Sequence, residues 1–299
     1  RSDLLAMLME GHRGLAVAGA HGKSTTTAML SLALGGATLC VGAEVPWGAG
    51  TGAAWGDGPW FCAEADESDR SLLRLAPEGA ILLNIDHDHH STYASIGEVE
   101  DVFRQFVSGL PASGILVVGP DARARAVAAL APCEVRTVGD VDGAWACLDD
   151  DVLVLAGGRR IDMHLAAPGA HNRQNAACAV ALADWCGVDP GLAAERIAPF
   201  TGVGRRFEDK GTAAGVRVVD DYAHHPAEVT ATIDAARGIH PGRVVAVFQP
   251  HLYSRTREMA EEFGHALSAA DVVVVTDVYA AREEAVPGVD GTLITRAVS

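Results

Sequence analysis

Lysine is nearly missing from this chain. Only Lys23 and Lys210 are lysines among 299 residues, and arginine supplies the rest of the 23 basic side chains, against 39 acidic ones. The formal net charge of −16 and the pI near 5.1 argue against a nucleic-acid binder, because phosphate contacts need a basic surface. Since lysines are this rare, one that stands in a glycine-rich segment is informative.

Long apolar runs and paired cysteines are also lacking. No run approaches the ~20 apolar residues that cross a bilayer, and the opening residues Arg1-Ser2-Asp3 do not begin a signal peptide. We therefore expect a cytoplasmic protein with no membrane insertion. The six cysteines form no Cys-x-x-Cys pair and stand among apolar residues, which predicts reduced core thiols rather than a metal or redox site. They are Cys40, Cys62, Cys133, Cys147, Cys178 and Cys186.

Composition and length indicate a globular protein of two domains. Hydrophobic residues make up 49% of the chain and charged residues 21%, and 299 residues exceed one ordinary domain. Strand and helix patterns alternate, and the strands are short and apolar as in a buried parallel sheet. In the first domain, 1–203, we expect strands at 15–19, 60–65, 80–84 and 115–119, helices at 24–34, 96–110 and 172–186, and an antiparallel patch within 134–165. This predicts an α/β domain with helices on a mostly parallel sheet.

A second, smaller domain is predicted at 204–299. Pro199, Gly202 and Gly204 interrupt the pattern, so the boundary is placed near Phe200–Arg206. After it the alternation restarts, with strands expected at 216–220, 244–249 and 272–278 and helices at 227–237 and 255–269. The spacing indicates a Rossmann-like α/β domain.

The strongest chemical signal is a glycine-rich turn between a strand and a helix. Its sequence is Ala18-Gly19-Ala20-His21-Gly22-Lys23-Ser24-Thr25-Thr26-Thr27. Glycines let backbone amides cradle phosphate oxygens, the lysine reaches the terminal phosphates, and the following hydroxyl binds Mg²⁺. The run departs from the general P-loop pattern, whose first glycine would fall at Val17. A plain glycine turn does not explain Lys23-Ser24 at the start of a helix, so we interpret the segment as a P-loop.

Acidic residues follow the next strand, in the run Phe61-Cys62-Ala63-Glu64-Ala65-Asp66-Glu67-Ser68-Asp69. Carboxylates at the carboxyl end of a parallel strand lie beside the phosphate loop. Glu64 stands on the apolar strand itself, which favours a Mg²⁺ ligand. For Asp66, Glu67 and Asp69, a solvated acidic turn is the better interpretation.

A third cluster, Asn84-Ile85-Asp86-His87-Asp88-His89-His90, follows another strand. Taken alone it fits a zinc site, a second Mg²⁺ site or a polar loop. Its place at a strand end near the P-loop favours a role at the phosphates.

Together these runs resemble the Mur ligase family. Five further runs strengthen the resemblance, and the likeness extends from about residue 10 to the end of the chain. They are Gly169-Ala170-His171-Asn172-Arg173-Gln174-Asn175, Gly202-Val203-Gly204-Arg205-Arg206-Phe207-Glu208, Asp220-Asp221-Tyr222-Ala223-His224-His225-Pro226, Phe248-Gln249-Pro250-His251-Leu252-Tyr253-Ser254-Arg255-Thr256-Arg257 and Asp277-Val278-Tyr279-Ala280-Ala281. The resemblance implies an ATP-dependent ligase that joins L-alanine to the carboxylate of UDP-N-acetylmuramate through an acyl phosphate. ATP and Mg²⁺ are then the cofactors, and the expected state is a monomer or homodimer.

The resemblance also implies roles for residues of the P-loop domain. Gly19 to Thr25 would hold the ATP phosphates, and Lys23 would neutralise charge on the transferring group. Ser24 and Glu64 would bind one Mg²⁺, and His89 the second.

Four further residues are implied contacts of the nucleotide. Asn172 and Asn175, one helical turn apart, would face the adenine, although Asn172 also fits a plain residue at a helix start. Arg206 would contact the γ-phosphate and Asp221 the ribose hydroxyls.

The second domain is implied to hold the reacting groups, because Tyr222, His224 and Arg255 would position the sugar-nucleotide carboxylate and alanine. Two departures accompany the resemblance. Leu252 stands where the family often has arginine. The family's N-terminal UDP-binding domain is lacking and the C-terminal domain stops early, so we expect a truncated chain. The alternatives are a sibling ligase that attaches a recycled peptide, and a nucleotide-binding protein without ligase activity.

Overall fold

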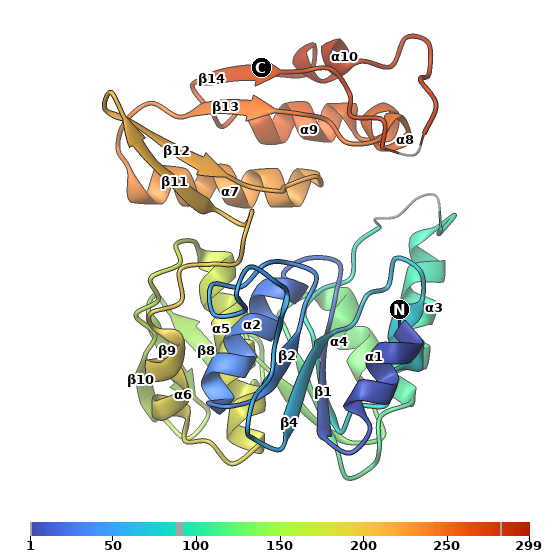
Figure 1. Cartoon of the computed structure of the whole chain (residues 1–299), viewed down its shortest axis with the longest axis vertical. Coiled ribbons are helices and arrows are strands. Elements are labelled where there is room, and N and C mark those ends of the chain that lie inside the picture. Colours follow the sequence, from blue (N-terminus) through green and yellow to red (C-terminus); the bar gives the residue numbers. More distant parts are fainter. Residues whose placement is uncertain (1, 88–91, 282) are drawn as a thin grey trace. The chain divides into compact units, whose positions relative to one another are not determined.

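The computed structural model describes residues 2–87, 92–281 and 283–299 (Figure 1). The chain divides into two compact units, one extending to Glu208 and the other from Asp209 to Ser299. The division lies a few residues beyond the boundary expected from Gly202 and Gly204. Each unit has its own hydrophobic core. No helix in the described part of the chain is long and apolar enough to cross a bilayer.

The first unit is built on a seven-stranded sheet in the order β3-β2-β4-β1-β5-β6-β7. All neighbours pair in parallel except β2 and β3, which confirms the mostly parallel sheet. The strands are β1 Arg13–Ala18, β2 Thr38–Cys40, β3 Ala53–Ala54, β4 Trp60–Glu64, β5 Gly79–Leu82, β6 Ile115–Val118 and β7 Glu134–Thr137. Because β1 lies between β4 and β5, the segments that follow these three strands share one edge of the sheet.

Helices cover both faces of this sheet. They are α1 Ser2–Met9, α2 Lys23–Leu34, the 3₁₀ turn η1 Ser71–Arg74, α3 Ile96–Ser108, α4 Ala122–Ala128, α5 Ala170–Trp185 and α6 Pro190–Ile197. Side chains of β1 alternate between the faces: Leu15 and Val17 pack with the cluster of α2 and α5, whereas Ala16 and Ala18 pack with that of α3 and α4. Both faces are buried, so the strand reads as a continuous apolar run.

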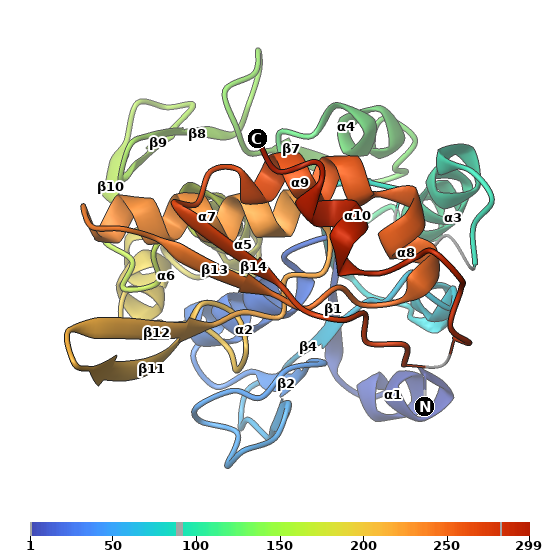
Figure 2. The same ribbon diagram turned by 90° about the horizontal axis from the view of Figure 1, so that it is seen from above.

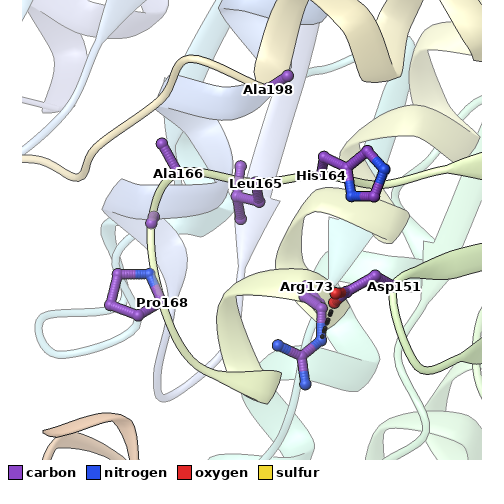
Figure 3. Close-up of a pocket in the computed structure, with 8 residues that line it drawn as sticks. Asp151, His164, Leu165, Ala166, Pro168, Arg173 and Ala198 are labelled. Carbon is purple, nitrogen blue, oxygen red and sulfur yellow. Dashed lines mark ion pairs between the residues drawn. The ribbon is translucent and has the colours of Figure 1, made fainter. Parts of the chain in front are cut away.

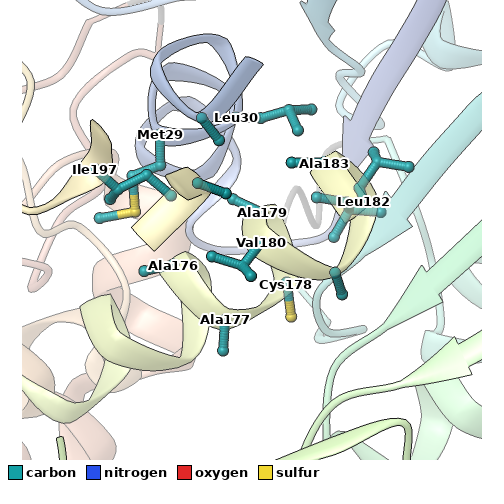
Figure 4. Close-up of a cluster of buried hydrophobic side chains, with 14 of the residues drawn as sticks. Met29, Leu30, Ala176, Ala177, Cys178, Ala179, Val180, Leu182, Ala183 and Ile197 are labelled. Atoms are coloured by element: carbon teal, nitrogen blue, oxygen red, sulfur yellow. The ribbon is translucent and has the colours of Figure 1, made fainter. Parts of the chain in front are cut away.

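Helix α2 is apolar or small on nearly every side because it packs against both α5 and α6. Figure 4 shows this cluster, which includes Met29 and Leu30 of α2, the small side chains Ala176 and Ala179 of α5, and Ile197 of α6. Small residues let the helices approach closely. Full burial of a leucine or methionine contributes about 1.5–3 kcal/mol, so this packing fixes the helix whose first turn carries the P-loop lysine.

A three-stranded antiparallel sheet joins the first unit, in the order β10-β9-β8. Its strands are β8 Ala146–Asp149, β9 Val152–Leu155 and β10 Arg160–Asp162. The predicted antiparallel patch is therefore confirmed, although its first stretch, β7, extends the parallel sheet instead.

The second unit contains two separate two-stranded sheets. Figure 2 shows β13 and β14 side by side and the β11–β12 hairpin set apart from them. The strands are β11 Glu208–Ala213, β12 Val216–Asp220, β13 Val245–Phe248 and β14 Val272–Val275, and the helices are α7 Pro226–Ile239, α8 Tyr253–Glu258, α9 Ala260–Leu267 and α10 Gly291–Thr295. Strand β12 therefore pairs with β11 and not with the parallel pair. The single helix expected over 255–269 is two helices, because Met259 has a non-helical backbone (φ −120°, ψ 21°).

Candidate active site

The P-loop joins β1 to α2 and its glycines are required by the backbone. Gly19 and Gly22 have φ values of 138° and 85°, which side chains of L-residues rarely adopt. A Cβ on Gly19 would lie 3.1 Å from the backbone nitrogen of Asn84, and one on Gly22 would lie 3.0 Å from Oδ1 of Asn175. Conformation and close packing therefore both select glycine, and the second contact places Asn175 against the P-loop.

Lys23 is the first residue of α2, and its ammonium is held inside the loop. Nζ donates to the carbonyl oxygens of Gly19 at 2.7 Å and Ala20 at 3.1 Å, and it lies 2.9 Å from Oε2 of Glu67. Burial acts to lower the pKa of Lys23, but the carboxylates of Glu67 and Glu64 outweigh it and hold the pKa above its ordinary value. The lysine is therefore positively charged when a phosphate arrives.

Glu67 is buried, with 2% of its surface exposed, so the interpretation as part of a solvated turn is wrong for this residue. Its carboxylate pairs with Lys23, and its carbonyl oxygen accepts hydrogen bonds from the Tyr93 hydroxyl and from the amide of Arg70. Asp66 and Asp69 are exposed and accept local turn bonds, as expected. The ion pair of Glu67 could not be predicted from the sequence, because its partner Lys23 lies 44 positions away in the chain.

Ser24 and Glu64 lie together as the Mg²⁺ prediction requires. The Ser24 hydroxyl donates to Oε2 of Glu64 at 2.8 Å, and the amide of Gly42 donates to the same oxygen at 2.8 Å. In an octahedral Mg²⁺ shell with bonds of 2.0–2.1 Å, adjacent oxygen ligands lie about 2.9 Å apart. The hydroxyl and the carboxylate therefore already have the spacing of two neighbouring ligands, and the residues fit the ion. Gly42 was not singled out from the sequence, because it acts through its backbone.

Asn84 fixes the middle of the P-loop. Its side chain accepts from the amide of His21 at 2.8 Å and donates to the carbonyl of the same residue at 3.1 Å. The His21 ring in turn lies 3.4 Å from Asp86. The cluster after β5 is therefore brought to the phosphate loop. His89 lies outside the described residues, so its role at a second Mg²⁺ stays a prediction.

Asn172 and Asn175 lie in the first turns of α5 and are 7% and 8% exposed. Asn172 donates to the carbonyl of Pro168 at 2.6 Å, which is the structural role of a residue at a helix start. A pocket lies beside this helix start (Figure 3), where Arg173 pairs with Asp151 at 3.3 Å. It is lined by Asp151, His164, Leu165, Ala166, Ala167, Pro168, Arg173 and Ala198. Because its arginine is paired, the pocket offers no uncompensated positive charge to a phosphate.

Arg206 lies at the end of the first unit, in a turn that packs on the sheet domain. Val203 is buried, the amide of Arg206 donates to its carbonyl at 3.1 Å, and the amide of Gly204 donates to Glu44 at 2.7 Å. Gly202 has a φ of 126° in this turn. Contact of Arg206 with a γ-phosphate stays a prediction.

In the second unit, Asp221 follows β12 and accepts from the amide of Ala223 at 2.7 Å, a local turn. Its predicted contact with the ribose stays a prediction.

Aromatic rings and imidazoles gather after the strands of the second unit. The Tyr222 and His224 rings lie 5.1 Å apart, and His251 lies 6.3 Å from His224 and 5.5 Å from Tyr279. Arg255 is 5% exposed and places a guanidinium nitrogen 3.4 Å from Nδ1 of His251. The three predicted substrate residues are thus connected through His251. Sequence reasoning gave no role to His251 or Tyr279, although both stand in runs that carried the resemblance.

Leu252, which replaces the expected arginine, has a φ of 72°. Its amide donates to the Tyr279 carbonyl at 2.9 Å, and its own carbonyl accepts from the Thr256 hydroxyl at 2.8 Å. Neighbouring hydrogen bonds thus hold a strained backbone at the cluster.

Comparison with known proteins agrees with this geometry. Residues 62–183 match the Mur ligase middle domain and residues 205–299 match the Mur ligase, glutamate ligase domain. The UDP-N-acetylmuramate–L-alanine ligase of Rubrobacter xylanophilus is 47% identical over 309 residues, covering 100% of this chain and 69% of the relative. That of Streptomyces griseus is 44% identical, covering 98% and 67%. The crystal structure of UDP-N-acetylmuramate-alanine ligase from Thermotoga maritima has a TM-score of 0.76 and 28% identity, covering 93% and 64%.

This chain thus spans about two thirds of the length of the relatives that it matches. The similarity extends over both compact units. The chain therefore belongs to the Mur ligase family.

Proposed function

We propose that this chain carries the ATP-binding and acceptor-binding parts of a cytoplasmic ligase that joins L-alanine to the carboxylate of UDP-N-acetylmuramate in peptidoglycan precursor synthesis. The observation that carries the proposal is the assembly of Lys23, Ser24 and Glu64 at one edge of the sheet, in a chain 47% identical to a ligase of that name. ATP and Mg²⁺ are the cofactors.

In the first step, the γ-phosphoryl group passes from ATP to the carboxylate. Two anions must approach each other, so positive charge has to be fixed where the transition state develops it. Lys23 supplies such a charge because it is held protonated, and Arg206 is proposed to supply another. Ser24 and Glu64 would hold one Mg²⁺ and His89 is the proposed ligand of a second; when bound, the ions would neutralise charge on the phosphate oxygens.

In the second step, the amine of L-alanine attacks the acyl phosphate, and the tetrahedral intermediate collapses to the amide and inorganic phosphate. Arg255 is proposed to bind a carboxylate and Tyr222 to line the acceptor site. His224 is proposed to orient the amine, and its own ring is fixed by the Tyr222 carbonyl at 2.9 Å and by Glu228 at 3.4 Å. No covalent bond to the protein is needed.

The test is ADP release by a chimaera in which this chain replaces the aligned 69% of the Rubrobacter xylanophilus ligase. We expect continuous ADP release only when UDP-N-acetylmuramate and L-alanine are both present, because without L-alanine the first step forms at most one ADP per active site; L-alanine should be preferred over a tripeptide. Preference for the tripeptide would assign the chain to the sibling ligases. ATP binding without ADP release under either condition would show a nucleotide-binding protein without this activity.

A further inference from the structure

The ammonium of Lys23 has three N–H donors, and it contacts three partners within the protein. Its partners are the carbonyl oxygens of Gly19 and Ala20 and the carboxylate of Glu67, at 2.7, 3.1 and 2.9–3.0 Å. A terminal phosphate that hydrogen-bonds to Lys23 must therefore take the place of one of these three partners.

The two kinds of partner differ in strength. The ammonium of Lys23 and the carboxylate of Glu67 carry opposite charges, so a Coulomb attraction adds to their hydrogen bonds, whereas the two carbonyl oxygens belong to neutral groups. The Lys23 and Glu67 side chains are only 11% and 3% exposed, so solvent screens their attraction little. The longest of the three contacts is the one to the neutral Ala20 carbonyl. That carbonyl is the partner that a phosphate oxygen displaces most easily.

The backbone of Glu67 is held by two hydrogen bonds. Its carbonyl oxygen is fixed by the Tyr93 hydroxyl and by the amide of Arg70 at 3.0 Å. Tyr93 is 1% exposed, and its ring carries the Arg70 guanidinium 5.4 Å from the centroid. The carboxylate therefore extends towards Lys23 from a backbone that its neighbours hold in place.

We propose that Glu67 is a positioning residue that stays bonded to Lys23 when the nucleotide binds and directs its ammonium to the terminal phosphate. The inference rests on the proposed function and deepens it. It assigns the discrimination between ATP and ADP to the contact of the Glu67 carboxylate with Nζ of Lys23. Glu67 itself touches neither substrate nor phosphate.

Two substitutions of Glu67 test separately the length of its side chain and its negative charge. Glu67→Asp keeps the charge but shortens the side chain by one methylene, so the carboxylate no longer reaches Nζ. Glu67→Gln keeps the length and an acceptor oxygen but removes the charge. Dissociation constants of ATP-Mg²⁺ and ADP-Mg²⁺ are measured by titration calorimetry for the 299-residue chain and both variants, and thermal melts identify the folded material.

Glu67→Asp is expected to weaken ATP-Mg²⁺ about tenfold or more, the effect of losing one charge-assisted hydrogen bond, and ADP-Mg²⁺ less than about threefold. Glu67→Gln is expected to change the ratio of the two constants less than Glu67→Asp does, because it loses the charge but keeps an acceptor oxygen within reach of Nζ. Equal weakening of both nucleotides in Glu67→Asp, or a ratio lost in Glu67→Gln but kept in Glu67→Asp, would overturn the inference. Failure of the unaltered chain to bind ATP-Mg²⁺ would instead overturn the proposed function.

Discussion

Lys23 and Lys210 are the same side chain in very different surroundings. Lys23 forms a buried ion pair in the P-loop, whereas Lys210 lies on the exposed hairpin strand β11. We predict that Lys23→Met removes detectable ATP-Mg²⁺ binding and also lowers the free energy of unfolding by about 3–5 kcal/mol, because it leaves a buried carboxylate without this partner. Calorimetry and urea titration measure the two effects. Lys210→Met is the matched control, and an equal loss of binding in that variant would refute a local role for Lys23.

The magnesium site gives a second prediction for single residues. Glu64→Gln removes the charged ligand but keeps the acceptor oxygen that Ser24 and the Gly42 amide contact. The Mg²⁺ concentration needed for half-maximal ATP binding should rise about tenfold or more.

Asp69→Asn is the control for that measurement, since Asp69 belongs to the same acidic run but is exposed and bonded to Ser71. A similar rise in both variants would mean that the general negative charge attracts Mg²⁺ and that Glu64 is no ligand.

Glycines in the connecting elements differ in what surrounds them. Gly22 and Gly158 have φ values of 85° and 80°, but a Cβ on Gly22 would lie 3.0 Å from Asn175, whereas one on Gly158 would meet nothing within 4 Å. Alanine at either position pays about 1–2 kcal/mol for the left-handed backbone. Only Gly22→Ala should also weaken ATP-Mg²⁺ binding, because Asn175 and the P-loop must shift. Unchanged binding in folded Gly22→Ala would show that this packing does not shape the nucleotide site.

Helix α5 contains a buried thiol whose ionisation opposes folding. Burial raises the pKa of Cys178 to about 12, although the Gln174 amide acts against it. The unfolded chain releases this proton near pH 8.5–9 and the folded chain near 12. The stability that Cys178 contributes is therefore complete below about pH 8.5 and is lost as the pH rises towards 12.

The measurement is the free energy of unfolding from pH 8 to 11 for the unaltered chain and Cys178→Ala. The difference between them should shrink as the pH rises. A constant difference would mean that the thiol does not ionise on unfolding.

Helices and strands with a strong apolar pattern could be predicted from the sequence. Elements whose bounds depend on polar side chains or on backbone conformation could not. Strand β1 and helix α2 were expected because a buried strand leads into a glycine turn and a lysine-serine helix start. Strand β11, with the sequence Glu-Asp-Lys-Gly-Thr-Ala, has no such pattern and is defined by its pairing with β12. The break between α8 and α9 was also not predicted, because the apolar residues around Met259 have helical spacing and only its backbone conformation departs from a helix.

The same division holds for the candidate site. Ser24 and Glu64 were predicted because their chemistry is local to the P-loop and to the end of β4. Gly42 was missed because it contributes an amide that any residue type carries, and Glu67 because its contact joins segments distant in sequence. Contacts between residues that are distant in the sequence become visible only in the folded structure.

At the scale of the whole molecule, each compact unit contains its own group of candidate residues. The first unit contains Lys23, Ser24 and Glu64, the residues proposed to act on the nucleotide. The second contains the cluster of Tyr222, His224, His251, Arg255 and Tyr279. The central claim is that the γ-phosphoryl group is transferred to a carboxylate before the amide forms.

The most direct test follows the carboxylate oxygen. UDP-N-acetylmuramate with ¹⁸O in both carboxylate oxygens is supplied with ATP, Mg²⁺ and L-alanine to the chimaera with the Rubrobacter xylanophilus ligase. The mass of the released phosphate is then measured by mass spectrometry. We predict one ¹⁸O atom in each phosphate. The amine displaces phosphate by breaking the bond between the acyl carbon and the bridging oxygen, so that oxygen leaves with the phosphate. Phosphate without label, or label found in AMP, would contradict it.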